Sequence, residues 1–349
     1  MSRFTRPTLC AAAISAVLAA GACSIQRSMP TGQTAAFDDH TAHMMPADRM
    51  APTMSHDGMA GMQQGDLSLP PSNNTAAARL AASPRHGEWV KISMGAGSSD
   101  SLMAWVVYPS TKKKAPVVVV VHEIFGLSTW VRGVADQVAA EGFIAVAPDF
   151  LSRVRGGPTS VELNADSARK IIAGVNADER NRVIAAAANY AMMLPAAQQK
   201  YAVIGYCWGG QTTFMHTING GLKGFSGGVA FYGLPYTTGG TPATATTAAV
   251  PASLDVDSLR KIKKPIMLLS GSKDARIGAA MPALDSIMKK IGKTYSGTNY
   301  EGAVHGFLRA QADPNTAKRN EAEEAANLAA TKDGWPKTVA FLKKNLGVK

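Results

Sequence analysis

A glycine-rich turn around Cys207 constrains the fold more than any other feature of the chain. The apolar run at 201–204 is typical of a buried strand, and the sequence Gly-Tyr-Cys-Trp-Gly-Gly at 205–210 follows it directly. Glycines two residues on either side of a central residue permit a sharp, strained turn, because larger side chains there would clash with it. The motif therefore predicts a strand, a tight turn at Cys207 and a helix that begins near Gly209.

Such a turn makes Cys207 a candidate nucleophile. It lifts the sulfur above the sheet and points the backbone N–H of Trp208 to the place where an oxyanion would form. The partial positive charge at a helix N-terminus also favours thiolate over thiol. The alternative is a buried cysteine that acts as a small core residue. The motif alone leaves both interpretations open.

Two further polar residues follow Cys207 in an informative order. Asp274 lies in a loop after the apolar run at 265–270, and His305 lies in a glycine-flanked loop after the run at 294–300. A single Asp is often a helix cap and a single His often a surface residue. A nucleophile, an acid and a histidine in this chain order, each just after a predicted strand, favour a catalytic triad of Cys207, Asp274 and His305.

Hydrophobic runs and helical patterns alternate along the chain from about residue 88. The five valines at 117–121 are typical of a strand in a parallel sheet that is covered on both faces. We therefore predict an α/β fold, with a mostly parallel central sheet and helices on both faces. The predicted strands are 103–108, 116–121, 143–147, 201–204, 228–232, 265–270 and 294–300, and the predicted helices are 128–141, 177–193, 209–218, 279–291 and 317–344.

Four sequence motifs resemble those of the dienelactone hydrolase family, the cysteine-using branch of the α/β-hydrolases. The resemblance covers the chain from Glu88 to its C-terminus and implies the α/β-hydrolase fold. The motifs are His-Glu-Ile-Phe-Gly at 122–126, Pro-Asp-Phe-Leu-Ser-Arg at 148–153, Gly-Tyr-Cys-x-Gly-Gly at 205–210 and His-Gly-Phe-x-Arg at 305–309.

The resemblance implies roles for further residues. Glu123 would hold the thiol in the resting enzyme, Arg153 and Arg309 would bind a substrate carboxylate, and Tyr232 would lie near the oxyanion. Arginine suits this task because its planar fork can bind a carboxylate with two hydrogen bonds. We further hypothesise that an anionic substrate paired with Arg153 releases Glu123. The alternatives are a loop acid at Glu123 and solvated surface arginines in a chain with 36 Lys and Arg.

The resemblance also implies a reaction, that of a carboxymethylenebutenolidase-like carboxylic ester hydrolase. His305 would activate Cys207 while Asp274 orients the imidazole. The backbone N–H groups of Ile124 and Trp208 would stabilise the oxyanion, and water would hydrolyse a thioester intermediate. We expect a small anionic lactone or activated ester as substrate, no cofactor and a monomer. A carboxylesterase or thioesterase with an unrelated substrate is the alternative.

The N-terminus predicts export. Residues 1–22 have a basic start and a short run of small apolar residues, which is typical of a secretory signal. Cys23 follows Ala-Gly-Ala, which resembles a lipoprotein acceptor site, although Ala20 stands where Leu is usual. Lipidation of Cys23 with anchoring in a membrane, and ordinary cleavage after Ala22, both stay open. In either case we expect a periplasmic location.

Residues 23–85 predict a disordered tether, because they are rich in Pro, Gly, Ala and Ser and show no periodicity. Thioether and imidazole groups suit copper, so an exported copper-binding protein is an alternative function. A flexible linker with incidental methionines is the other interpretation, and a copper titration of a peptide covering 38–64 separates the two. The candidate ligands are His40, His43, Met44, Met45, Met50, Met54, His56, Met59 and Met62.

The remaining chain, 86–349, predicts a single catalytic domain. Its segment 236–253 is rich in Thr, Ala, Gly and Pro and is longer than the family resemblance leads us to expect. The sequence therefore does not predict which residues cover the substrate pocket. The net charge is +11, but the basic residues do not cluster with aromatic residues, which argues against nucleic-acid binding. It fits an anionic substrate or an anionic membrane surface.

Overall fold

The computed structural model describes residues 64–95, 99–159, 164–239, 253–313 and 320–348. The predicted signal at 1–22, the lipidation candidate Cys23, the whole copper tract and residues 240–252 of the 236–253 segment lie outside the described residues. No helix within the described ranges is long and apolar enough to cross a membrane. The same ranges contain no cluster of His, Cys, Asp and Glu suited to a metal ion.

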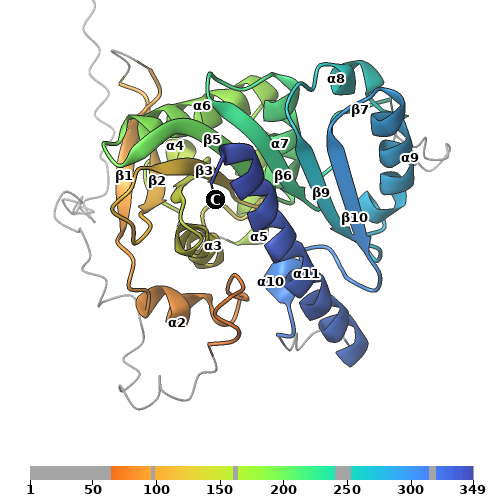
Figure 1. The fold of residues 1–349 in the computed structure, drawn as a ribbon, viewed down its shortest axis with the longest axis horizontal. Coiled ribbons are helices and arrows are strands. Elements are labelled where there is room, and N and C mark those ends of the chain that lie inside the picture. Colours follow the sequence, from red (N-terminus) through yellow and green to blue (C-terminus); the bar gives the residue numbers. More distant parts are fainter. Residues whose placement is uncertain (1–63, 96–98, 160–163, 240–252, 314–319, 349) are drawn as a thin grey trace, which may run out of the picture. The chain divides into compact units, whose positions relative to one another are not determined.

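The central sheet has eight strands in the order β1-β2-β4-β3-β5-β6-β9-β10 (Figure 1). The strands from β4 to β10 in this order pair in parallel, whereas β2 pairs antiparallel to both of its neighbours. A separate ribbon pairs β7 with β8. The strands are β1 Gly87–Ser93, β2 Ser101–Val107, β3 Ala115–Val121, β4 Ile144–Pro148, β5 Ala197–Tyr206, β6 Phe225–Phe231, β7 Thr237–Thr238, β8 Ser253–Leu254, β9 Ile266–Gly271 and β10 Tyr295–Tyr300.

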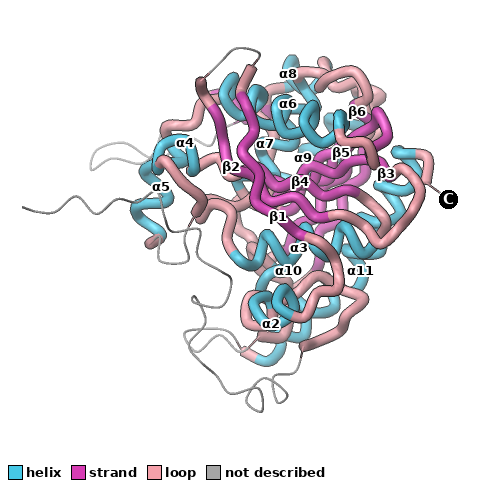
Figure 2. Tube along the Cα trace, turned by 90° about the vertical axis from the view of Figure 1, so that its left-hand side faces the viewer, coloured by secondary structure: helices cyan, strands magenta, loops and turns pink. Residues whose placement is uncertain are grey.

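Helices cover both faces of this sheet, as Figure 2 shows. The longest described helix, α11, and helix α3 cover one face, and α6, α7 and α9 cover the other. The helices are α2 Ala76–Ala81, α3 Thr129–Ala140, α4 Ser152–Arg155, α5 Ala165–Ala173, α6 Ala177–Met193, α7 Trp208–Ile218, α8 Val256–Arg260, α9 Ile277–Lys290, α10 Phe307–Ala310 and α11 Glu321–Leu346.

The valine run of β3 explains why two helical layers are needed. Its side chains alternate between the faces: Val118 and Val120 pack in the core beside α3 and α11, whereas Val117, Val119 and Val121 pack beside α6. All five are fully buried. A strand that is apolar on both faces must be covered on both faces. The predicted α/β-hydrolase fold is confirmed.

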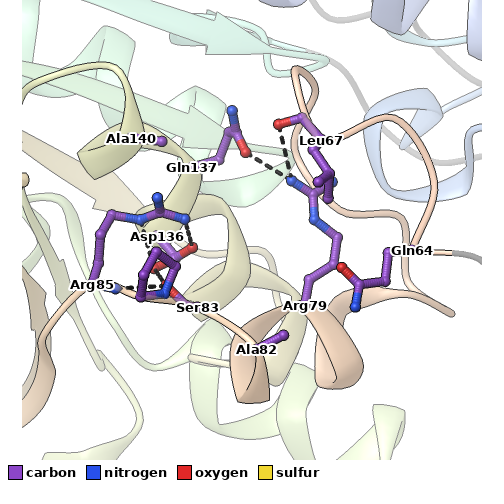
Figure 3. A pocket seen from close by; sticks show the side chains of 10 residues that line it. Gln64, Leu67, Arg79, Ala82, Ser83, Arg85, Asp136, Gln137 and Ala140 are labelled. Atoms are coloured by element: carbon purple, nitrogen blue, oxygen red, sulfur yellow. Dashed lines mark hydrogen bonds and ion pairs between the residues drawn. The ribbon is translucent and has the colours of Figure 1, made fainter. Parts of the chain in front are cut away.

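The structure differs from the sequence prediction at the N-terminal side of the domain. Strand β1 was not predicted, and residues 64–85, predicted to be disordered, lie against α3 in the described structure. Leu69 and Ala76 are buried there. Polar contacts add to this packing: Arg79 donates to the side chain of Gln137, and Arg85 binds Asp136 (Figure 3). The domain therefore includes the segment from residue 64 onward. The sequence did not predict this because the apolar side chains that the segment buries follow no periodic pattern.

Two adjacent methionines at the end of α6 test the contribution of core packing to stability. Met192 is 5% exposed and packs in the core, whereas Met193 is 82% exposed. We expect Met192→Ala to lower the free energy of unfolding by about 2–5 kcal/mol, because it leaves a cavity. Met193→Ala is the matched control and should change it by less than about 0.5 kcal/mol. Chemical denaturation measures both, and equal losses would contradict the packing described.

Candidate functional site

The turn at Cys207 has the strained geometry that the glycine motif predicts. Cys207 lies between β5 and α7 with φ 56° and ψ −112°, a backbone conformation that residues other than glycine rarely adopt. A Cβ atom on Gly205 would lie 2.1 Å from the carbonyl oxygen of Gly209, and one on Gly209 would lie 2.3 Å from that of Val121. The backbone N–H of Cys207 donates to the carbonyl of Phe231 at 3.0 Å. Close backbone approaches therefore require both glycines.

The loop after β3 lies directly beside the start of α7. The carbonyl groups of Val121 and His122 approach Gly209 so closely that no side chain fits between them. Ile124 of this loop and Cys207 pack against the same core cluster. Trp208 is the first residue of α7, so its N–H has no partner within the helix. This arrangement supports the oxyanion assignment of Ile124 and Trp208, which stays a prediction.

His305 and Asp274 come together from two loops at the same edge of the sheet. Nδ1 of His305 lies 2.5 Å from Oδ2 of Asp274. The other carboxylate oxygen of Asp274 accepts from the backbone N–H groups of Arg276 at 3.2 Å and Ile277 at 3.0 Å. These contacts fix the orientation of a carboxylate that is only 7% exposed. The aspartate is thereby held in place to orient the histidine.

The electrostatics of this pair favour a charged histidine. Burial lowers the pKa of His305, but hydrogen bonds to Asp274 and Cys207 outweigh this and raise it to about 10. Burial raises the pKa of Asp274, and the bonds from His305 and Ile277 lower it more strongly, so the net shift is downward. The structure therefore brings the three predicted triad residues together, with His305 between Cys207 and Asp274.

Glu123 pairs with Arg309 at the edge of the same site. The distance from Oε2 of Glu123 to Nη1 of Arg309 is 3.4 Å, and the glutamate side chain is 5% exposed against 35% for the arginine. Burial raises the pKa of Glu123, and the charges of Arg309 and His305 oppose this. Arg309 also lies over the ring of Phe125, 5.2 Å from its centre. The carboxyl group is thus shielded while the guanidinium stays accessible.

Arg153 is already engaged by two carboxylates. Its Nε donates to Oδ1 of Asp100 at 3.0 Å, a second nitrogen binds the other oxygen of Asp100, and a third forms an ion pair with Glu179. The side chain is 23% exposed. A substrate carboxylate would have to compete with both partners. The predicted role of Arg153 is therefore less well supported by the structure than that of Arg309.

Tyr232 lies close to the histidine, as a residue near the reacting atoms should. Its ring centre is 4.9 Å from that of His305, and its backbone has a positive φ of 39°. Its hydroxyl and that of Tyr206 are buried and have no hydrogen-bond partner among the described residues. Burial raises the pKa of both phenols, and the charge of Glu123 adds to the effect. Two buried phenol hydroxyl groups that sense the charge of Glu123 therefore have no partner in the described part of the chain.

Sequence reasoning missed two residues near Cys207. Tyr206 received no role within the turn motif, although it directly precedes the cysteine. Arg180 of α6 lies 4.3 Å from the ring centre of Trp208 and donates to the side chain of Gln211 at 3.0 Å. Burial lowers the pKa of Arg180 to about 10. No local signal distinguishes Arg180 from a surface arginine, because its partners follow it by about thirty residues in the chain.

His122 has a structural role in the loop after β3. It is fully buried; its Nδ1 lies 2.5 Å from the carbonyl of Glu123, and its Nε2 accepts from the N–H of Phe150 at 3.1 Å. Burial lowers the pKa of His122. A neutral ring with its proton on Nδ1 satisfies both contacts. This histidine thus ties the β3 loop to the loop after β4.

The raised pKa of His305 predicts how the pair contributes to stability. The protonated imidazole gains a partner on folding, so its contribution is fully present below the ordinary pKa of 6.5 and is lost as the pH rises through about 10. We therefore expect the difference in free energy of unfolding between the wild-type protein and His305→Gln to shrink across this range. Denaturant titrations at several pH values measure it, and a constant difference would reject the ion pair.

Comparisons with known proteins identify the family of the chain. The sequence model of the dienelactone hydrolase family matches residues 102–346. A Synechocystis protein named "Putative carboxymethylenebutenolidase" is 26% identical over 253 residues, which cover 70% of this chain and 92% of that protein. A Bradyrhizobium protein named "Probable 2-oxo-3-(5-oxofuran-2-ylidene)propanoate lactonase" is 26% identical over 264 residues, which cover 74% and 94% of the two chains.

A solved structure supports the fold. The crystal structure titled "Putative Dienelactone Hydrolase", from Klebsiella pneumoniae, superimposes with a TM-score of 0.56 at 21% identity and covers 74% of this chain and 98% of that chain. The family match spans the sheet from β2 to β10, including Cys207, Asp274 and His305. The curated relatives, named for carboxymethylenebutenolidase and lactonase activities, support an ester or lactone hydrolase. The chain therefore belongs to the dienelactone hydrolase family and is a hydrolase of this kind.

Proposed function

We propose that this hydrolase cleaves a small anionic lactone or activated ester through a Cys207 thioester. The observation that carries the proposal is the contact chain from Cys207 through His305 to Asp274, built on a strained turn at the start of α7. A thiolate beside an imidazolium is a reactive nucleophile at neutral pH. The names of the Synechocystis and Bradyrhizobium relatives support a lactone as the substrate class.

The proposed reaction has two steps. The sulfur of Cys207 attacks the lactone carbonyl carbon, the ring C–O bond breaks, and His305 gives its proton to the departing oxygen. His305 then takes a proton from water, the resulting hydroxide attacks the thioester, and the C–S bond breaks to release the carboxylate product. The thiolate is a good leaving group, so this chemistry suits lactones and activated esters better than ordinary alkyl esters. The N–H groups of Ile124 and Trp208 would stabilise both oxyanions.

Arg309 is the group we propose to bind the substrate carboxylate. It is partly exposed and its ion pair with Glu123 is long, whereas Arg153 is held by Asp100 and Glu179. A carboxylate on Arg309 would also weaken the charge that opposes the burial-driven rise in the pKa of Glu123, so this pKa would rise further and Glu123 would become a better proton acceptor. Release of Glu123 would then depend on Arg309 rather than on Arg153.

The reaction predicts a strict dependence on the thiol. We expect Cys207→Ala to lower kcat for a dienelactone and for a nitrophenyl ester by at least about 10⁴-fold, because the nucleophile is lost. Initial rates of the purified protein measure this, with Met193→Ala as a surface control. Ester turnover without lactone turnover in the wild-type protein would keep Cys207 and reject the lactone. Equal rates in wild type and variant would reject both.

The anion site predicts selective effects of arginine substitutions. We expect Arg309→Ala to raise KM for a carboxylate-bearing lactone by about tenfold to a hundredfold, since a hydrogen bond to a charged group contributes about 1.5–3 kcal/mol. The KM of an uncharged nitrophenyl ester should change much less. Arg153→Ala should have the smaller effect of the two, and Arg169→Ala, an exposed arginine of α5, serves as the control. A larger effect at Arg153 would show that its carboxylate partners yield to substrate.

A further inference from the structure

A segment outside the family match contacts helix α10, which carries Arg309, and the residues that follow it. Residues 66–83 precede the matched region 102–346, yet they pack onto α3. The indole N–H of Trp130 donates to the carbonyl of Pro71 at 2.9 Å, and a Cβ on Gly133 would lie 2.7 Å from the ring of Pro71. Figure 3 shows the second attachment, where Arg79 donates to Gln137. We call residues 66–83 the brace.

The other side of the brace binds the segment that follows His305. The backbone N–H of Asn73 donates to the carbonyl of Arg309 at 2.8 Å. The side chain of Gln311 donates to the carbonyl of Pro70 at 2.8 Å, and the N–H of Asn74 donates to Oδ2 of Asp313 at 2.9 Å. Figure 1 shows α2 and its flanking loops beside α10. The brace therefore links α3 to residues 309–313.

The segment that the brace contacts, α10 with Gln311, is too short and too strained to keep its conformation by itself. Helix α10 is a single turn of four residues, and isolated single turns are unstable. It begins after Gly306 at φ 78° and ends at Gln311, whose φ of 43° and ψ of −135° are unfavourable for any residue with a side chain. A strained conformation persists only where its surroundings enforce it. The burial of Phe307 and Leu308 against the core constrains the start of α10, and the bonds from Gln311 to Pro70 and to the carbonyl of Leu308 at 3.1 Å constrain its end.

We propose that the brace positions Arg309 and so sets the selectivity of the enzyme for anionic substrates. The inference rests on the proposed function, in which Arg309 binds the substrate carboxylate. The brace fixes the backbone of Arg309 through Asn73, while Glu123 holds its guanidinium from the other side. Asn73, Gln311 and Asp313 are positioning residues, since they act on substrate through Arg309.

Two substitutions in the full chain loosen the brace without touching the triad. Asp313→Ala removes the acceptor for Asn74, and Gln311→Ala removes the bond to Pro70. Asp313→Asn is the rescue variant because it keeps an acceptor oxygen. The control is Asp285→Ala, which removes an exposed carboxylate that accepts from the hydroxyl of Tyr295, away from α10.

The readout compares alkylation of Cys207 by iodoacetate, which is anionic, and by iodoacetamide, which is neutral. Mass spectrometry of the peptide that contains Cys207 gives both rates. We expect the ratio of iodoacetate to iodoacetamide rates to fall by about threefold to tenfold in Asp313→Ala and in Gln311→Ala, since small displacements of a binding group are costly. Asp313→Asn should restore the ratio, and Asp285→Ala should leave it unchanged. Arg309→Ala sets the lower limit.

Steady-state kinetics supply the second readout. The same two variants should raise KM for a carboxylate-bearing lactone relative to that for an uncharged nitrophenyl ester, whereas a general loss of structure would lower both activities together. Unchanged alkylation ratios in both Asp313→Ala and Gln311→Ala would overturn the brace proposal. Altered ratios in a protein that hydrolyses no lactone would keep the brace and reject the proposed substrate.

Discussion

The left-handed backbone of Cys207 is the constraint on which the rest of the structure depends. A side chain at φ 56° is unfavourable unless the neighbouring backbone enforces it, and here β5, α7 and the β3 loop approach within contact distances that allow glycine alone at 205 and 209. The same approach places the β3 loop, which carries Ile124, beside the start of α7 at Trp208. The backbone strain and the placement of the candidate nucleophile therefore have a common cause.

Charge pairing arranges the second part of the site. The chain pairs two arginines with three acids on this side of the sheet, but the pairs differ in strength. Arg153 is neutralised by Asp100 and Glu179, whereas Arg309 shares a single, longer contact with a buried glutamate. A buried acid beside one partly exposed cation responds to an incoming anion, because an anion bound to Arg309 would weaken the positive charge that opposes the upward shift in the pKa of Glu123. Selectivity and activation of the proposed reaction would thus be linked.

Sequence reasoning succeeded where the signal was local. The valine run and the glycines of the turn each predict a feature that a few neighbouring residues determine. It failed where the partners are distant. Arg153 meets one acid just before β2 and another in α6, and residues 64–85 pack against Trp130 and Gly133 of α3. Strand β1 was missed because its short edge sequence carries charges among its apolar residues.

The position of the brace affects how the protein should be divided. A shortened protein that began at the family boundary, residue 102, would keep every candidate triad residue and would still bury most of the sheet. It would lose β1 and the surface on which Trp130 and Gln311 rest, leaving an indole N–H and a strained residue without their partners. Such a fragment could fold and retain a reactive thiol, yet misrepresent the substrate range of the intact chain.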